Sequence, residues 1–418
     1  MDSPLRPLDG LRYGLLGAPL AFAALPLYVL LPSHYATQFG VPLAGLGLVL
    51  LGARSLDALI DPWLGRLVDL RFALGRRAVL ALALLAALLL GAGFAALFFP
   101  PQGDTTRLLA WCGVALLVTY LGYSALGVLH QSWGARLGGD AQAQARIAGW
   151  REGLALAGVL VASVLPALAG IGAMVAICIV GLGIGLLALA RAPYNAQKQG
   201  AASAPALATP WRQGAFRALL AVFLLNGIAS AVPATLVLFF VRDRLQAQAF
   251  EPLFLGGYFA AGALSMPLWV RIVARWGLVR AWLLGMALAV ASFSWAVALG
   301  PDAVLPFALV CIASGVALGA DLSIPGALLT GVIQRAGDAQ RLEGAYLGWW
   351  NCATKLNLAL AAGLALPALQ LLGYRPCARD ASALQALALA YAVLPCVLKL
   401  MAAALLLRLR RSIEGSSR

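Results

Sequence analysis

Hydrophobic residues lie along the chain in about twelve long runs, which are separated by short polar breaks. A helix rises about 1.5 Å per residue, so about 20 apolar residues cross the hydrocarbon core of a bilayer. Because each run reaches that length, the pattern predicts an all-α integral membrane protein with twelve transmembrane helices. We expect these helices at residues 12–32, 42–66, 77–99, 107–131, 146–170, 172–191, 214–241, 250–274, 278–299, 303–332, 344–372 and 383–408.

The composition supports a membrane protein. Of the 418 residues, 62% are hydrophobic and 11% are charged, whereas about a quarter of the residues in a soluble domain are charged. The mean hydropathy is +0.89. A soluble fold has too little interior to bury so much apolar surface, so we expect the lipid bilayer to surround most of the chain.

The basic residues indicate a topology rather than a nucleic-acid partner. The net charge of +14 is spread over short loops instead of one soluble face. Because positive loops stay in the cytoplasm and twelve spans put both termini on one side, we expect a multi-pass protein of the inner (plasma) membrane with both termini cytoplasmic. The residues on the expected cytoplasmic side include Arg66, Arg71, Arg76, Arg77, Arg136, Arg146, Lys198, Arg212, Arg275, Arg280, Arg335, Arg341, Arg408, Arg410 and Arg411.

The longest polar stretch, residues 193–212, lies midway along the chain and is rich in Ala, Ser, Gln and Pro, which is typical of a linker. It predicts an N-terminal six-helix bundle at 1–192 and a C-terminal six-helix bundle at 213–418. A weak internal repeat, Pro62 to Arg66 and Pro267 to Arg271, supports two related halves. Six plus six helices with a central cytoplasmic loop is the plan of the major facilitator fold, whose halves rock about a site near the middle of the membrane.

The chain has none of the motifs that we associate with enzymes or metal sites. Its six cysteines form no CxxC pair, and neither a histidine motif for zinc nor a phosphate-binding loop is present. We therefore expect no cofactor, no metal and no enzyme activity. A lipid-modifying membrane enzyme that uses His130 and Asp140 would need more acids or histidines at one interface, and a sensor or scaffold would usually carry a soluble domain.

Charged residues inside the membrane mark the candidate site, because each costs about 2.5 to 3.5 kcal/mol to insert. In the helix at 42–66, Arg54, Asp57 and Asp61 are spaced i, i+3 and i+7 and share one face. Two carboxylates one turn apart can bind a cation, or one of them can take up and release a proton. We expect Asp57 and Asp61 to bind a coupling ion, H⁺ or Na⁺. The alternative is that Arg54 only neutralises one aspartate.

Four charged residues after this helix form a candidate cytoplasmic gate, namely Arg66, Asp69, Arg76 and Arg77. Gly65 permits a close helix approach beside them. Ion pairs between Asp69 and arginines would form in one transport state and break in another. The alternative is an ordinary positively charged loop.

Two further charged positions lie in helices of the first half. Arg151 lies far enough into the helix at 146–170 to face a cavity, where it would bind carboxylates, although it could also extend to the membrane surface. His130, at the end of the helix at 107–131, can contribute to a polar pocket or lie at its rim.

The second half carries a lysine deep in an apolar run. Lys355 follows Trp350 and Asn351 in the helix at 344–372, and we expect it to pair with an acid or with a negative group of a substrate. Asp321, in the helix at 303–332, is the candidate partner.

In this order the charged residues resemble the glycoside-pentoside-hexuronide:cation symporters, the melibiose permease group of the major facilitator superfamily, over nearly the full chain. The resemblance implies cation-driven uptake, with the cation on Asp57 and Asp61, and with Arg151 and Lys355 linking the cation and substrate sites. The matching segments are Arg54-Ser-Leu-Asp57-Ala-Leu-Ile-Asp61-Pro62, Asp69 with Gly75-Arg76-Arg77, Arg146-Ile-Ala-Gly-Trp-Arg151, Gly319-Ala-Asp321 through Pro325, Glu343-Gly-Ala-Tyr-Leu-Gly-Trp-Trp-Asn351 with Lys355, and Gly373-Tyr374.

The chain departs from this family where sugar and sodium would bind. Ala21, and either Leu129 or His130, stand where sugar-binding members have aspartates, so two acceptors for sugar hydroxyls are absent. Ile60 and Leu126 replace a family asparagine and threonine. Sodium needs several oxygen ligands, whereas a proton needs one carboxylate, so we expect proton coupling in preference to sodium.

The sequence therefore predicts a secondary transporter, expected to be monomeric, that couples a cation to the symport of a small organic solute. The positive charges of Arg151, Lys355 and His130 favour an anionic or amphiphilic solute over a neutral sugar. The family resemblance leaves a glycoside-like solute open. The alternative is a proton-driven exporter of an organic or amphiphilic compound, because the same carboxylates would serve either direction.

Overall fold

The structure, a computed structural model, describes residues 6–41, 43–138, 140–195, 207–371 and 380–414, and these ranges contain helices and no strand. Ten helical segments among them are long and apolar enough to cross a membrane. Two more helices reach a spanning length, α4 (Leu43–Leu74) with 32 residues and α13 (Glu343–Leu371) with 29. The predicted all-α membrane fold is confirmed.

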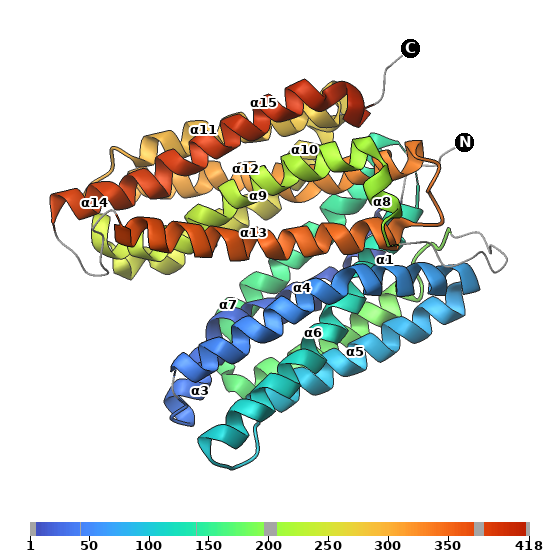
Figure 1. Ribbon diagram of the computed structural model, residues 1–418, viewed down its shortest axis with the longest axis horizontal. Coiled ribbons are helices and arrows are strands. Elements are labelled where there is room, and N and C mark those ends of the chain that lie inside the picture. Colours follow the sequence, from blue (N-terminus) through green and yellow to red (C-terminus); the bar gives the residue numbers. More distant parts are fainter. Residues whose placement is uncertain (1–5, 42, 139, 196–206, 372–379, 415–418) are drawn as a thin grey trace. The chain divides into compact units, whose positions relative to one another are not determined.

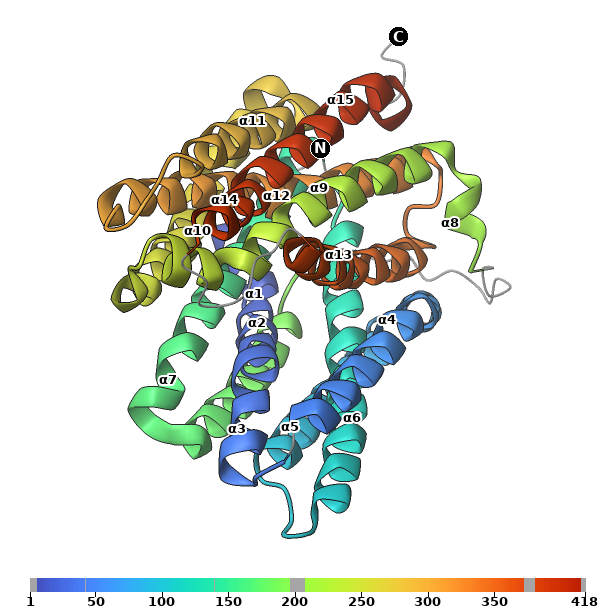
Figure 2. The ribbon, with the colours of Figure 1, turned by 60° about the vertical axis from the view of Figure 1, so that its left-hand side comes forward.

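The chain divides into two compact units, of which unit 1 comprises Met1–Pro210 and Ala336–Cys352. Besides α4 and the start of α13, its main helices are α1 (Pro7–Gly14), α2 (Gly17–Leu25), η1 (Pro26–Leu30), α3 (Leu31–Gln38), α5 (Arg76–Phe98), α6 (Thr105–Arg136) and α7 (Ala141–Leu189). Helix α6 packs along both α4 and α5, and α2 packs along α7 (Figure 2). Asp140 caps the start of α7, since its carboxylate accepts a hydrogen bond from the Ala143 N–H at 2.8 Å.

Helix α7 reverses direction at Gly170, where φ is +80° and ψ is 173° (Figure 2). A residue with a side chain would be strained at this positive φ, so glycine allows the tight turn. Membrane-spanning segments lie on either side, at Ala141–Pro166 and Leu168–Leu189. These segments correspond to the helices predicted at 146–170 and 172–191.

Small residues let α2 approach α7 closely. A Cβ atom on Gly158 would lie 2.1 Å from the carbonyl oxygen of Ala18, which is far inside van der Waals contact. The backbones of the two helices therefore touch at this point. This is the packing expected in a bilayer, where close contact rather than water exclusion drives helix association.

Unit 2 comprises Trp211–Arg335 and Ala353–Arg418. Its main helices, besides the end of α13, are α9 (Gly214–Phe239), η2 (Phe240–Arg244), α10 (Glu251–Trp276), α11 (Leu278–Ala296), α12 (Val304–Arg335), α14 (Ala381–Ala388), η4 (Leu389–Val393) and α15 (Leu394–Glu414). Helix α12 packs against α10 and α11, and α15 packs against α9 and α11 (Figure 1).

Aromatic rings fill the core of unit 2. Phe240 stacks on Tyr391, with ring centroids 4.2 Å apart, and Phe254 meets Phe307 edge to face at 4.9 Å. Such contacts stabilise the packing beyond the area that they bury. They hold α9, α10, α12 and the last helical segments together at one end of the unit.

Helix α13 is divided between the two units, with residues 343–352 in unit 1 and the remainder in unit 2. Most of the expected linker, residues 196–206, lies outside the described residues, as does the Gly373-Tyr374 match. The division into bundles at 1–192 and 213–418 stays a prediction.

Candidate functional site

The two aspartates of α4 are buried in unit 1. The exposed fraction is 6% for Asp57 and 0% for Asp61. Ser124 of α6 donates a hydrogen bond to the Asp57 carboxylate at 2.6 Å. Arg54 lies with its guanidinium 3.9 Å above the ring of Tyr28, where a cation–π interaction stabilises its charge. Arg54 thus has a stabilising partner besides the aspartates, and the helical spacing did bring two carboxylates into the interior.

Sequence reasoning missed Ser124, because an isolated serine within the apolar run at 107–131 is common in membrane helices. Only the packing of α6 against α4 shows that it faces Asp57.

A second buried cluster lies at the start of α13. The guanidinium of Arg136 pairs with Asp69 at 2.7 Å and with Glu343 at 2.9 Å, and each of these side chains is at most 2% exposed. Asp69 also accepts hydrogen bonds from the N–H groups of Gly344 at 2.7 Å and Ala345 at 2.8 Å. A carboxylate in this position caps the helix and interacts favourably with its dipole. We call Asp69, Arg136, Glu343, Gly344 and Ala345 the α13 capping cluster.

From the helix lengths, we expect the α13 capping cluster to lie beyond the hydrocarbon core. Helix α4 has 32 residues and is therefore about 48 Å long, against about 30 Å for the core, and both Asp69 and Glu343 lie outside the expected spans 42–66 and 344–372. Burial raises the pKa of the Asp69 carboxyl to about 7, against the opposing effect of Arg136. Burial also raises the pKa of Glu343. Two acids on one guanidinium therefore favour a bound proton.

Backbone contact makes this cluster possible. A Cβ atom on Gly65 would lie 2.0 Å from the carbonyl oxygen of Gly344, and one on Gly348 would lie 2.5 Å from that of Asp61. The start of α13 thus lies directly on the α4 turn that carries Asp61, as the prediction of close approach at Gly65 suggested.

The other predicted gate residues have different surroundings. Arg76 donates hydrogen bonds to the carbonyl oxygens of Ala190 at 2.7 Å and Ala192 at 3.1 Å, and so ties the end of α7. Arg66 is half-buried and Arg77 is exposed. The arginine that pairs with Asp69 is Arg136, which the sequence reasoning listed only as a topology signal.

Arg151 and His130 both contact residues of unit 1 other than the α4 aspartates. Arg151 forms an ion pair with the neighbouring Glu152, with its Nε 2.8 Å from the carboxylate. A ring nitrogen of His130, which is 1% exposed, lies 2.8 Å from the carbonyl oxygen of Tyr13, and the Tyr13 hydroxyl donates to the carbonyl oxygen of His130 at 3.1 Å. His130 therefore joins α6 to α1.

The predicted residues of α13 fall in both units. Trp350, which is buried, and Asn351 belong to unit 1, whereas the half-buried Lys355 belongs to unit 2. Their assignment to substrate binding stays a prediction.

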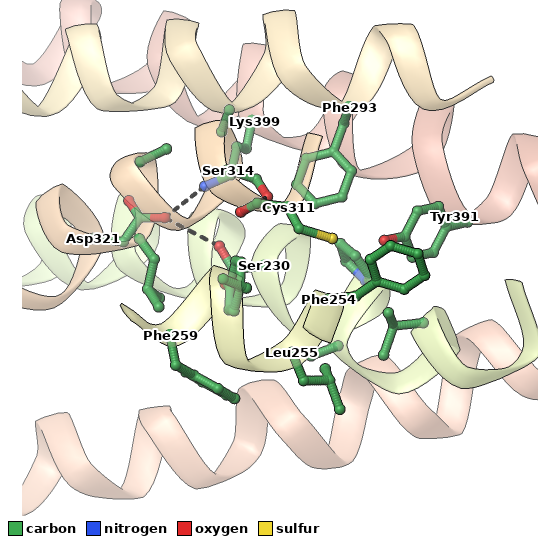
Figure 3. Close-up of a pocket in the computed structure, with 17 residues that line it drawn as sticks. Ser230, Phe254, Leu255, Phe259, Phe293, Cys311, Ser314, Asp321, Tyr391 and Lys399 are labelled. Carbon is green, nitrogen blue, oxygen red and sulfur yellow. Dashed lines mark hydrogen bonds and ion pairs between the residues drawn. The ribbon is translucent and has the colours of Figure 1, made fainter. Parts of the chain in front are cut away.

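Asp321 of α12 pairs with a different lysine from the one expected. Its carboxylate lies 2.7 Å from the Nζ of Lys399 on α15, which takes the place of Lys355 as the partner (Figure 3). It also accepts hydrogen bonds from Asn226 at 3.1 Å, Ser230 at 3.2 Å and Trp282 at 3.0 Å. Lys399 donates in addition to the Asn226 side chain at 2.9 Å. We call these five residues the Asp321 network.

The packing of the helices explains why Asp321 pairs with Lys399 instead of Lys355. Lys399 lies in the long apolar run of the last helix, and its partner is 78 residues away in sequence. Because α15 packs against α9 and lies close to α12, it brings this lysine to the acid. The expectation paired Lys355 with Asp321 because both lie in the second half of the chain, and it did not consider Lys399.

Comparison with solved structures places this architecture among transporters. A bacterial homologue of the iron transporter ferroportin, in an outward-facing state, matches with a TM-score of 0.68 and 19% identity over 96% of this chain and 100% of that chain. The human organic anion transporter MFSD10 (TETRAN) matches with a TM-score of 0.63 and 17% identity over 94% and 98%. A variant of the E. coli fucose:proton symporter FucP matches with a TM-score of 0.63 and 16% identity over 94% and 97%. At these identities the likeness shows the fold.

Sequence comparison identifies the family. No curated protein sequence matches the chain. The family described as MFS/sugar transport protein matches residues 12–411, which is nearly the whole chain. The chain is therefore a multi-pass membrane protein that belongs to this family of the major facilitator superfamily of transporters.

Proposed function

We propose that the protein is a proton-coupled symporter of a small organic solute in the inner (plasma) membrane, with both termini cytoplasmic. The observation that carries the proposal is the pair of buried carboxylates, Asp57 and Asp61, one turn apart on α4. A carboxylate within a transporter can take up a proton and release it when its surroundings change. Intramembrane acids of this kind are typical of proton pathways in transporters.

The resemblance to the melibiose permease group supports the same assignment, because its pattern of an arginine and two aspartates before a proline is present at Arg54 to Pro62. Proton coupling is favoured over sodium coupling because Ile60 and Leu126 replace two residues that would supply oxygen ligands. One carboxylate suffices for a proton.

The α13 capping cluster supplies the conformational step in this proposal. Asp69 and Arg136 belong to the first half of the chain, and the start of α13 belongs to the second, so their contacts join segments that must separate if the two halves rock. Asp61 lies on the α4 turn that Gly348 of α13 touches. Protonation of Asp61 and release of α13 are thus coupled through adjacent backbone.

Proton flux in liposomes tests the function. Purified protein is first screened by thermal shift against sugars, sugar acids, organic anions and lysolipids, and the solute with the largest shift is added outside proteoliposomes. We expect the external medium to become more alkaline, with the rate at least about tenfold lower in Asp57→Asn and Asp61→Asn, the loss expected from removing a group essential to proton transfer. The control, Asp104→Asn, keeps a good capping residue at the start of α6 and should behave as wild type.

Two results would overturn the proposal. Unchanged alkalinisation in both α4 variants would remove Asp57 and Asp61 from proton coupling. External acidification upon addition of the solute would show that solute and proton move in opposite directions, as in an exporter.

A further inference from the structure

A cavity of about 140 Å³ lies within unit 2 and is bounded on one side by the Asp321 network (Figure 3). Its polar groups gather at one end, where Ser230, Asp321 and Lys399 lie. Ser314 also lines the cavity, and the remaining lining is mostly apolar and rich in aromatic rings. It includes Val237, Phe254, Leu255, Tyr258, Phe259, Phe293, Cys311 and Tyr391.

Hydrogen-bond counting shows what the polar end can offer to a ligand. An ionised carboxylate has about four lone-pair sites, and Asp321 receives three donors, from Asn226, Trp282 and Lys399. The single hydroxyl proton of Ser230 can be donated either to Asp321 at 3.2 Å or to the carbonyl oxygen of Asn226 at 3.1 Å. An ammonium has three N–H donors, and among the described residues Lys399 uses two, on Asp321 and Asn226. Its third N–H can therefore bind a group in the cavity.

The charge at this end limits what that group can be. Asp321 neutralises Lys399 at 2.7 Å, and more of the acid than of the lysine is exposed, 13% against 4% of the side chain. An anionic ligand would face the carboxylate and be repelled. An uncharged oxygen acceptor, such as a carbonyl, ether or hydroxyl oxygen, can accept the Lys399 N–H without this cost.

The apolar end is held in a fixed shape. Tyr391 is stacked on Phe240 and lies 5.8 Å from Phe293, and Phe254 is locked edge to face against Phe307. Tyr391 projects from η4, a single π turn in which Leu394 donates to Leu389 directly before Pro395. π turns within helices are frequent at functional sites. The walls therefore exist before a ligand binds.

The size of the cavity sets the size of the occupant. A dry apolar cavity of about 150 Å³ holds one benzene molecule. The cavity in unit 2 thus has room for about one six-membered ring.

We propose that this cavity binds the ring of an uncharged amphiphilic solute, an aryl or similarly apolar ring with a neutral oxygen acceptor that receives the Lys399 N–H. The proposal rests on the proposed function only in taking the occupant to be part of the transported solute. Binding itself requires neither a gradient nor the α4 carboxylates.

Fluorine NMR on the full-length protein in detergent tests the site with three probes of matched size. These are 4-fluoroacetophenone, which has the neutral acceptor, 1-ethyl-4-fluorobenzene, which lacks it, and 4-fluorobenzoate, which is anionic. We expect saturable binding of 4-fluoroacetophenone. 1-Ethyl-4-fluorobenzene should bind about tenfold more weakly, in line with the loss of a hydrogen bond to a charged donor. 4-Fluorobenzoate should also bind about tenfold more weakly, because the Asp321 carboxylate repels its charge.

Two tryptophan variants separate the cavity from the detergent-covered surface. Leu255→Trp fills the cavity and should abolish saturable binding, whereas Leu264→Trp, on the same helix at an 81% exposed position, should bind as wild type. Undiminished binding in Leu255→Trp, or tightest binding of 4-fluorobenzoate, would overturn the proposal. Binding as expected together with no proton flux in liposomes would support this site while overturning the proposed function.

Discussion

Two clusters of buried charge, one in each unit, differ in their charge balance. In the α13 capping cluster of unit 1, the carboxylates of Asp69 and Glu343 share one guanidinium, that of Arg136. In the Asp321 network of unit 2, one carboxylate meets one ammonium, and three neutral donors complete the shell. With all groups ionised, the first cluster has a net negative charge and the second is neutral.

Because of this difference in charge balance, we expect the α13 capping cluster to change its protonation and the Asp321 network to keep its arrangement. A buried excess charge is costly, and a carboxyl removes it by binding a proton. The charges of the Asp321 network are already balanced, because one carboxylate faces one ammonium at 2.7 Å. We therefore expect the α13 capping cluster to respond to pH and the Asp321 network to act as a fixed wall of the cavity.

Removing the positive charge from the Asp321 network should have the largest effect on stability. Lys399→Met leaves the Asp321 carboxylate buried without its counter-charge, and removal of one partner from a buried pair typically costs about 3 to 5 kcal/mol. We expect the unfolding temperature in detergent to fall by roughly 10 °C. The measurement is thermal unfolding of the purified protein followed by intrinsic fluorescence.

The double variant Asp321→Asn with Lys399→Met is the control for lost packing. It removes both charges, so it should recover most of the stability that the single variant loses. Equal losses in the single and double variants would show that charge balance does not stabilise this network.

The pH response of the α13 capping cluster should be smaller. The pKa of Asp69 is raised to about 7 in the folded protein, above its value in the unfolded chain, so the folded state holds the extra proton between about pH 4 and 7. Stability from this group is fully present below that window and is lost as pH rises through 7. We expect the unfolding temperature of wild type to fall by a few degrees between pH 6 and 8.

The variant Glu343→Gln tests whether the second acid of the α13 capping cluster contributes to this pH dependence. It removes the second acid, whose charge raises the pKa of Asp69, and leaves Asp69 paired with Arg136 alone. The fall in unfolding temperature between pH 6 and 8 should then flatten, because the variant removes both the raised pKa of Glu343 itself and its effect on Asp69. An unchanged slope would contradict a proton shared within the cluster.

The residues of the two sites also show how much of the structure could be predicted from the sequence alone. Helical spacing sufficed to predict that Asp57 and Asp61 share an interior face, because that information is local to one helix. The length of the apolar runs predicted the helices for the same reason. The sequence also showed Asp321 as a charge within an apolar run, but its partner depends on which helices are neighbours.

Neighbouring helices are decided by packing between distant segments. Arg136 and Glu343 are 207 residues apart, and their contact depends on the glycine approach of α4 to α13. Lys399 belongs to an apolar run whose periodicity does not single out α12. The expectation of a positive cavity from Arg151, Lys355 and His130 depends on partners in the same way, and Arg151 pairs with Glu152.

An exposed ion pair gives the smallest expected effect and tests whether burial or distance decides the energies compared above. Arg242 Nε lies 2.6 Å from the Glu251 carboxylate, closer than Lys399 lies to Asp321, but the Arg242 side chain is 49% exposed. Water solvates the Arg242 guanidinium when the acid is removed, so Glu251→Gln should cost at most about 0.5 kcal/mol. We expect an unfolding temperature within about 1 °C of wild type, with even that difference disappearing in 0.5 M salt, where exposed charges are screened. If Glu251→Gln lowered the unfolding temperature as much as Lys399→Met, the distance between the charges rather than their burial would determine the energy of these ion pairs. The comparison of the two buried clusters by their charge balance would then be wrong.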